Sequence, residues 1–215
     1  MNLDRIFLSE SHPCGKELRY VQHALEAKAI TSGGNVVRDF EEDLECYLGN
    51  NVIVNATNSG TSAIHLGLLL LGVKPGDEVI CQSMTFSASV NPILYIGASP
   101  VFVDSELDTW NMCPIALEEA IQDRISKGKK PKCIIVVDLY GMPYHADRIN
   151  EVANKYGIAV LEDSAEALGS RYKGVPCGTL GDIGVFSFNG NKIITTSSGG
   201  ALLLSDASQK ERAAF

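Results

Sequence analysis

One stretch of the chain joins a buried strand, a turn and a lysine: Val185-Phe186-Ser187-Phe188-Asn189-Gly190-Asn191-Lys192. Residues 184–187 have the apolar character of a short buried strand, and Asn189-Gly190-Asn191 is typical of a turn. The turn places Lys192 in a loop at the end of the strand rather than on the solvated face of a helix. A lysine after a turn is most often a surface residue, so its interpretation depends on the residues that surround it in the fold.

Strand and helix patterns alternate along the rest of the chain. Apolar runs typical of buried strands cover residues 52–54, 77–81, 100–104, 133–138, 158–162, 185–188 and 201–204. Helical spacing of apolar residues is found at 16–29, 36–48, 62–71, 87–96, 114–125 and 146–156. Residues 55–61 are expected to form a polar loop. This alternation predicts one α/β domain with a mostly parallel central sheet covered on both faces.

Composition and charge exclude several classes of protein. The 215 residues are 45% hydrophobic and 20% charged, which is ordinary for a globular domain. The net charge of −8 argues against binding to nucleic acid or to an anionic membrane, because both need a basic surface. The longest apolar run, residues 66–73, is too short to span a bilayer.

The cysteines and the amino terminus indicate a cytoplasmic protein. None of the six cysteines forms a C-x-x-C pair, and several lie inside apolar runs, so we expect small core residues in a reducing compartment. Met1 to Glu10 is mixed and charged, unlike a signal peptide.

A polar loop precedes the third predicted helix, with the sequence Asn58-Ser59-Gly60-Thr61-Ser62. In parallel α/β sheets, ligands bind at the carboxyl ends of the strands, where such a loop would lie. The free N–H groups and dipole of a helix amino terminus, together with hydroxyl side chains, suit a phosphate monoester. The motif alone is weak evidence, because Ser and Thr at a helix start are usually only N-caps.

Asp163 follows the apolar strand predicted at 158–162, so its carboxylate is expected at the same edge of the sheet. A buried carboxylate needs a cationic partner, and a protonated pyridine nitrogen would serve. The alternative is that Asp163 only caps the next helix. A phosphate site, a carboxylate at a strand end and the loop residue Lys192 are together the parts that a pyridoxal phosphate (PLP) enzyme needs.

Several motifs carry a resemblance to a known family. They are NSGTSA (58–63), PGDEVI (75–80), TF (85–86), PVFVD (100–104), DLYG (138–141), EDSAEALG (162–169) and SFNGNK (187–192). In this order they resemble the DegT/DnrJ/EryC1/StrS sugar aminotransferases. The resemblance implies the large, PLP-binding domain of a fold type I (aspartate aminotransferase-like) enzyme over residues 1–215, with a helical segment at 1–50. It also implies a nucleotide-linked keto sugar as substrate, with glutamate as the amino donor.

The resemblance assigns roles by motif position and implies no metal. Lys192 would form the Schiff base with PLP, and Asp163 would hold the pyridine nitrogen. The phosphate would be held by Gly60, Thr61, Ser62 and Ser187. Phe86 falls where the family stacks an aromatic ring on the cofactor, and Glu166 falls where the family often has Gln, near the phenolic oxygen of the ring.

Further expectations follow from the same resemblance. The Asn-Gly-Asn-Lys turn and the opening Ile6-Phe7-Leu8-Ser9 most resemble UDP-4-keto-6-deoxy-N-acetylhexosamine aminotransferases. Family members are homodimers and are considerably longer, so a small C-terminal domain is expected to be missing from these 215 residues. The alternative to an active enzyme is a truncated, catalytically inactive PLP-binding or regulatory module.

Overall fold

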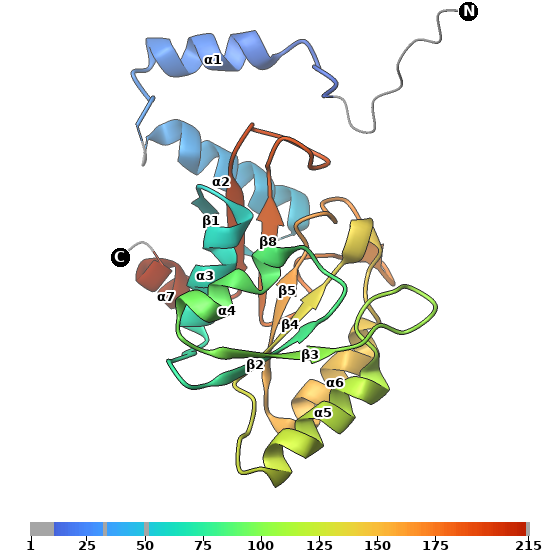
Figure 1. Cartoon of the computed structure of the whole chain (residues 1–215). Coiled ribbons are helices and arrows are strands. Elements are labelled where there is room, and N and C mark those ends of the chain that lie inside the picture. The colour runs from blue at the N-terminus through green and yellow to red at the C-terminus, as the bar shows by residue number, and fades with distance from the viewer. Residues whose placement is uncertain (1–10, 32–33, 50–51, 214–215) are drawn as a thin grey trace, which may run out of the picture.

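The computed structural model describes residues 11–31, 34–49 and 52–213, and a seven-stranded sheet forms its centre (Figure 1). The strands lie in the order β1-β9-β8-β5-β4-β2-β3. Their bounds are β1 (Ile53–Thr57), β2 (Glu78–Gln82), β3 (Ser99–Val103), β4 (Cys133–Val137), β5 (Ala159–Asp163), β8 (Ile183–Ser187) and β9 (Gly200–Leu204). A small antiparallel ribbon, not expected from the sequence, pairs β6 (Arg171–Tyr172) with β7 (Val175–Pro176).

The prediction of a mostly parallel sheet is confirmed. Strands β3, β2, β4, β5 and β8 run parallel, whereas β9 is antiparallel to both β8 and β1. The loop predicted at 55–61 is partly wrong, because β1 continues to Thr57. Its polar residues are held in the strand by pairing with β9: Asn55 pairs with Leu202 and Thr57 with Gly200.

Helices cover both faces of the sheet (Figure 1). One face packs against α3 (Gly60–Leu70) and α4 (Asn91–Tyr95), and the other against α5 (Pro114–Ser126) and α6 (Ala146–Tyr156). Successive residues of a strand point to opposite faces. Leu161 of β5 therefore belongs to the core on the α3 side, whereas its neighbour Val160 belongs to the core on the α5 and α6 side.

Two predicted helix boundaries need correction. The single helix predicted at 87–96 is a 3₁₀ turn, η1 (Ser87–Ser89), followed by the short α4. The break is explained by Pro92, which is tolerated only in the first turn of a helix because it lacks an N–H. Helix α3 begins at Gly60 rather than at Ser62, since Ser59 already caps its amino terminus.

The amino-terminal helices differ in how they contact the sheet. Helix α2 (Asn35–Leu48) packs on the edge strand β1, and its Glu45 and Glu41 accept the N–H groups of Val54 and Ala56 at 2.8 and 2.7 Å. These bonds satisfy an otherwise open sheet edge. Helix α1 (Glu17–Glu26) stands apart from the sheet and has no buried residue (Figure 1). Residues 1–10 of the predicted helical segment lie outside the described residues.

The cysteines follow the prediction only in part. Cys81, Cys133 and Cys177 are buried and free, as expected of small core residues, but Cys14 and Cys46 are exposed. Across the described ranges, the structure contains no helix with the length and apolar character that crossing a bilayer requires.

Candidate active site

A cavity of about 520 Å³ opens at the carboxyl ends of the parallel strands, the usual ligand position in such sheets. Most of the residues predicted for the site line it, namely Gly60, Thr61, Phe86, Asp163, Glu166, Ser187 and Lys192. Ser62 does not line the cavity. Its N–H donates to the Ser59 hydroxyl at 3.1 Å, and the two hydroxyls lie 2.9 Å apart. Because Gly60 and Lys192 line the same cavity, the fold brings together segments that are more than a hundred residues apart in sequence.

The amino terminus of α3 forms one wall of the cavity. Ser59 caps the helix, so the N–H groups of Gly60 and Thr61 belong to a first turn that lacks intrahelical partners. A Cβ on Gly60 would lie only 2.9 Å from the Cβ of Ser187. Glycine at this position allows the helix to approach β8 closely enough to place the Ser187 hydroxyl beside the helix terminus. This arrangement suits a phosphate group.

Asp163 is the last residue of β5, and its side chain is only 4% exposed. Its Oδ2 accepts a hydrogen bond from Ser89 Oγ at 2.6 Å, and its Oδ1 accepts one from the N–H of Ala165 at 3.2 Å. Burial raises the pKa of the Asp163 carboxyl, while these bonds and the charge of Lys192 act in the opposite direction. Among the described residues, no Lys, Arg or His forms an ion pair with Asp163. The carboxylate can thus receive a cationic ligand group.

Lys192 is held by the turn that the sequence indicated, because its N–H donates to the Asn189 carbonyl at 3.0 Å. The side chain is 12% exposed, and its Nζ donates to Oε1 of Glu166 at 3.1 Å. The other oxygen of Glu166 accepts the N–H of Tyr140 at 2.9 Å. Tyr140, which also lines the cavity, has a left-handed backbone with φ of +52° in the turn η2 (Leu139–Gly141). Glu166 therefore connects the loop lysine to a strained turn at the end of β4.

Two residues near the cavity were given no role by the sequence. Ser89 bonds Asp163, and Tyr140 bonds Glu166 through its backbone. Ser89 lies outside the motifs quoted for the resemblance. Tyr140 lies within DLYG (138–141), but that motif gave it no role at the site.

A pair of buried carboxylates, Asp138 and Glu162, was also missed. The pair lies on the opposite face of the sheet. Ser164 Oγ lies 2.6 Å from Oδ2 of Asp138 and 3.1 Å from Oε1 of Glu162. Glu162 also accepts the backbone N–H groups of Gly178, Leu180 and Gly181, at 2.7, 2.7 and 3.1 Å. Burial and the nearby charge of Asp138 raise the pKa of Glu162 to about 8, and burial also raises the pKa of Asp138. Burial therefore favours the protonated form in both carboxyls of the pair.

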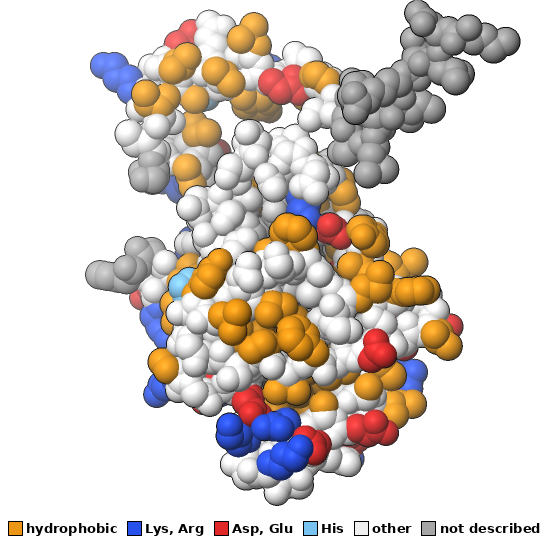
Figure 2. Space-filling model, viewed as in Figure 1, with side chains coloured by type: hydrophobic (Ala, Val, Ile, Leu, Met, Phe, Trp, Pro, Cys, Tyr) orange, Lys and Arg blue, Asp and Glu red, His pale blue; other side chains and the backbone are white. Residues whose placement is uncertain are grey.

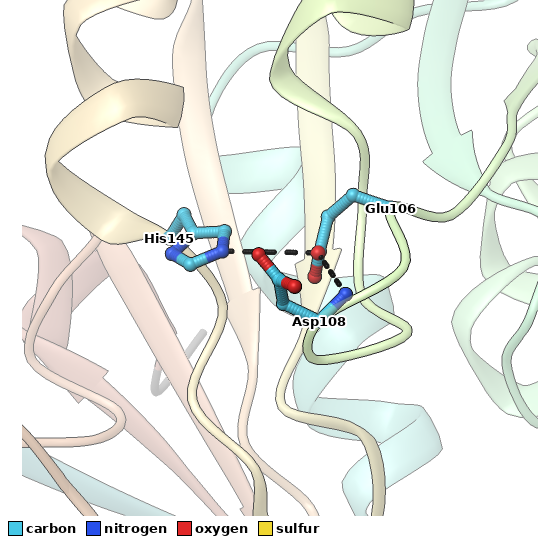
Figure 3. A group of neighbouring side chains, drawn as sticks. All are labelled: Glu106, Asp108 and His145. Atoms are coloured by element: carbon cyan, nitrogen blue, oxygen red, sulfur yellow. Dashed lines mark hydrogen bonds and ion pairs between the residues drawn. The ribbon is translucent and has the colours of Figure 1, made fainter.

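A cluster of two carboxylates and a histidine lies outside the cavity, where the loop after β3 meets the residue that precedes α6 (Figure 3). Glu106, Asp108 and His145 face one another, with 3.8 Å between Glu106 Oε2 and His145 Nε2. Glu106 also accepts the N–H groups of Asp108 and Thr109, at 2.6 and 2.8 Å. Burial works to raise the pKa of Glu106, but these bonds, the Thr109 hydroxyl and His145 lower it overall. The contacts of Glu106 are those of a residue that closes its own loop.

Comparison with known proteins identifies the fold as that of the PLP-dependent aminotransferases of fold type I. A solved structure from Streptococcus pneumoniae, in its PLP form, superposes with a TM-score of 0.85 at 35% identity, covering 95% of this chain and 54% of that one. The protein belongs to the DegT/DnrJ/EryC1/StrS aminotransferase family, whose profile matches residues 14–215. This confirms the resemblance seen in the sequence motifs.

Two curated relatives match nearly the whole chain. EpsN of Bacillus subtilis (strain 168) is 50% identical over 211 residues, which are 98% of this chain and 54% of EpsN. GDP-perosamine synthase of Escherichia coli O157:H7 is 44% identical over 200 residues, which are 92% of this chain and 52% of that protein. The chain thus spans about half the length of the curated relatives that it matches.

Proposed function

We propose that the protein is a PLP-dependent aminotransferase, or its cofactor-binding half, that converts a nucleotide-linked keto sugar to an amino sugar with glutamate as donor. The observation that carries this proposal is the position of Asp163. It is a buried carboxylate without a cationic partner among the described residues, in a cavity that also contains a lysine amine and a helix amino terminus. A protonated pyridine ring with an aldehyde and a phosphate offers a complementary group to each.

The residues of the cavity fit the cofactor in a consistent way. The α3 terminus at Gly60 and Thr61, together with Ser187, would hold the phosphate. The Asp163 carboxylate would hold the positive ring nitrogen, and the exposed ring of Phe86 would lie against the cofactor. Ser62 supports this site through Ser59 and has no direct role in the proposal. PLP bound in this way supplies an electron sink for the carbon that loses its proton.

The proton chemistry belongs to Lys192 and Glu166. The Lys192 amine is the nucleophile that would attach the cofactor, and when released it can hold a proton at Nζ and pass it on. Oε1 of Glu166, 3.1 Å away, stabilises the charged form of that amine and fixes its direction. In the overall exchange the sugar loses its keto oxygen and gains the amino group that glutamate gives up.

The substrate class is supported by the names of the relatives. GDP-perosamine synthase is named for a nucleotide-linked sugar product, whereas the turn ending in Lys192 resembles aminotransferases of UDP-linked sugars. We therefore place the protein in polysaccharide or glycan biosynthesis, acting on a GDP- or UDP-linked 4-keto sugar. Assays of both sugars with glutamate distinguish the two nucleotides.

The experiment that tests the cofactor site is borohydride reduction of the PLP-treated protein, followed by peptide mapping. We expect a phosphopyridoxyl label on Lys192. The label should be lost in Lys192→Ala and kept in Lys127→Ala, which removes an exposed lysine directly after α5. A label on any other lysine would overturn the proposal.

The competing proposal is an inactive PLP-binding or regulatory module, which would also carry the label. Turnover separates the two, because only the enzyme aminates a keto sugar when glutamate is supplied. Lys192 favours the enzyme, since a lysine amine is needed for the proton transfer but not for simple retention of a ligand.

We further propose a cytoplasmic homodimer. Helix α1 exposes Leu18, Val21 and Leu25, and a second group of hydrophobic side chains lies exposed over α4 and β3 (Figure 2). Exposed apolar groups of this kind favour association, and free cysteines fit a reducing compartment. Sedimentation tests the dimer, and a stable monomer at micromolar concentration would contradict it.

A further inference from the structure

We propose that Ser89 is a positioning residue of the cofactor site, which holds Asp163 charged and directed toward the cavity through a relay that begins at Thr85. This inference rests on the proposed function, because it assigns the cationic ring nitrogen of PLP as the partner of Asp163. It is carried by geometry: the Ser89 hydroxyl lies 2.6 Å from Asp163 Oδ2, and Thr85 Oγ1 lies 2.7 Å from Ser89 Oγ.

The direction of the relay follows from the hydrogen-bonding capacity of each group. An ionised carboxylate can only accept, so Ser89 must donate its single hydroxyl proton to Asp163. Ser89 Oγ can then only accept from Thr85, which makes Thr85 the donor of the second bond. The order is Thr85 to Ser89 to Asp163. If Asp163 were protonated on Oδ2, it would donate to Ser89 and the relay would have to reverse.

Because these groups are buried, the charge on Asp163 depends on the hydrogen bond from Ser89. Ser89 is 1% exposed and Asp163 is 4% exposed, so bulk water is a poor substitute for a lost donor at Oδ2. The only other hydrogen bond to the carboxylate among the described residues is the N–H of Ala165 at 3.2 Å, on Oδ1. A buried carboxylate keeps its charge only where donors or cations compensate for its lost hydration. Ser89 supplies the shorter of the two bonds.

The relay also connects two parts of the proposed site. Ser89 ends the turn η1, and its N–H donates to the carbonyl of Phe86 at 3.0 Å. The bond from Ser89 to Asp163 therefore fixes the turn that presents Phe86 relative to the end of β5. A ring held between the Phe86 side chain and the Asp163 carboxylate would depend on this one contact for its alignment.

The first test uses the protein without cofactor. The carboxyl ¹³C signal of Asp163, assigned with Asp163→Asn, is followed as a function of pH. Ser89→Ala should raise the midpoint by roughly one pH unit or more, as expected for loss of a charged hydrogen bond. Thr85→Val should shift it less, in the same direction. Ser87→Ala removes an exposed hydroxyl of the same turn and should leave the midpoint unchanged.

The second test uses the PLP-loaded protein. Ser89→Ala should weaken PLP binding and move the pH at which the visible absorption band of the cofactor changes, whereas Ser89→Thr, which keeps the hydroxyl, should restore both toward the wild type. A wild-type protein that takes up no PLP overturns the proposed function. A wild type that binds PLP, with Ser89→Ala behaving like Ser87→Ala in both tests, overturns the role of Ser89 alone.

Discussion

Glu162 and Asp163 are neighbours at the end of β5, yet they lie on opposite faces of the sheet, and their burial is compensated by different groups. Both are buried carboxylates. On the α3 face, Asp163 keeps two hydrogen-bond donors and remains open to a cavity where a cation can bind. On the α5 and α6 face, Glu162 is enclosed and is linked to Asp138 by the Ser164 hydroxyl, and burial raises the pKa of both carboxyls. Burial alone therefore does not mark a functional carboxylate.

The donors on the two faces also differ in kind. The shorter of the two bonds to Asp163 comes from the side chain of Ser89, whereas most of the donors to Glu162 are backbone N–H groups of residues 178–181. That loop is packed tightly, since a Cβ on Gly178 would lie 2.6 Å from Leu203 Cδ1. Glu162 thus fastens the loop before β8, and β8 leads to Ser187 and the Lys192 turn. The α3 face holds the candidate site, and the contacts of Glu162 on the other face stabilise the segment that leads to Lys192.

The largest expected effect separates the two faces by activity. Asp163→Asn in the PLP-loaded protein should slow amino transfer from glutamate by about 10²- to 10³-fold, since the amide cannot hold the ring nitrogen protonated. Side-chain volume is nearly unchanged, so the free energy of unfolding should change little. Asp138→Asn, on the other face, is the matched control and should keep most of the activity. Equal losses in the two variants would show that the distinction between the faces is wrong.

An intermediate effect concerns stability as a function of pH. The pKa of Glu162 is raised from 4.5 to about 8 in the folded protein. Its contribution to stability is therefore present below pH 4.5 and is lost as the pH rises toward 8, by up to roughly 1.4 kcal/mol per pH unit. Asp138→Asn removes one of the two charges and should reduce this decline.

The amide also fits the local contacts, because it can accept the Tyr144 N–H and donate to Ser164 as a protonated Asp138 would. Urea unfolding between pH 5 and pH 8, at intervals of roughly one unit, measures the slope. Asp39→Asn, an exposed carboxylate on α2, is the control for a simple change in net charge. A slope in Asp138→Asn equal to that of the wild type would show that Asp138 does not raise the pKa of Glu162.

The smallest expected effect has the opposite sign and comes from the cluster in Figure 3. The pKa of Glu106 is lowered in the folded protein, so its stabilisation is present above the unfolded pKa and is lost as the pH falls. Glu106→Gln should cost about 1 kcal/mol of unfolding free energy at neutral pH and almost nothing in acid. Asp108→Asn, an exposed carboxylate in the same loop, is the control. An equal cost for Glu106→Gln at both pH values would contradict this account.

The local sequence predicted the fold, and it named residues that the structure brings together around one cavity. Alternating apolar runs and helical patterns predicted a mostly parallel α/β sheet, and the motifs around Gly60, Asp163 and Lys192 identified the family. These features are readable because each depends on residues close together in the chain, such as the Asn-Gly-Asn turn that positions Lys192. The length of β1 could not be predicted from the local sequence, because its polar end forms a strand only through pairing with β9.

The tertiary structure decided which polar residues meet. Ser89 lies 74 residues before Asp163, and Asp138 lies 24 residues before Glu162, so neither contact leaves a local pattern. The alternation of a strand shows that Glu162 and Asp163 face opposite ways, but not which face holds the cavity. That depends on where α3 and α4 leave space and where α5 and α6 close it. The sequence by itself determined the chemical groups at the strand ends, and packing determined which of them remain open to a ligand.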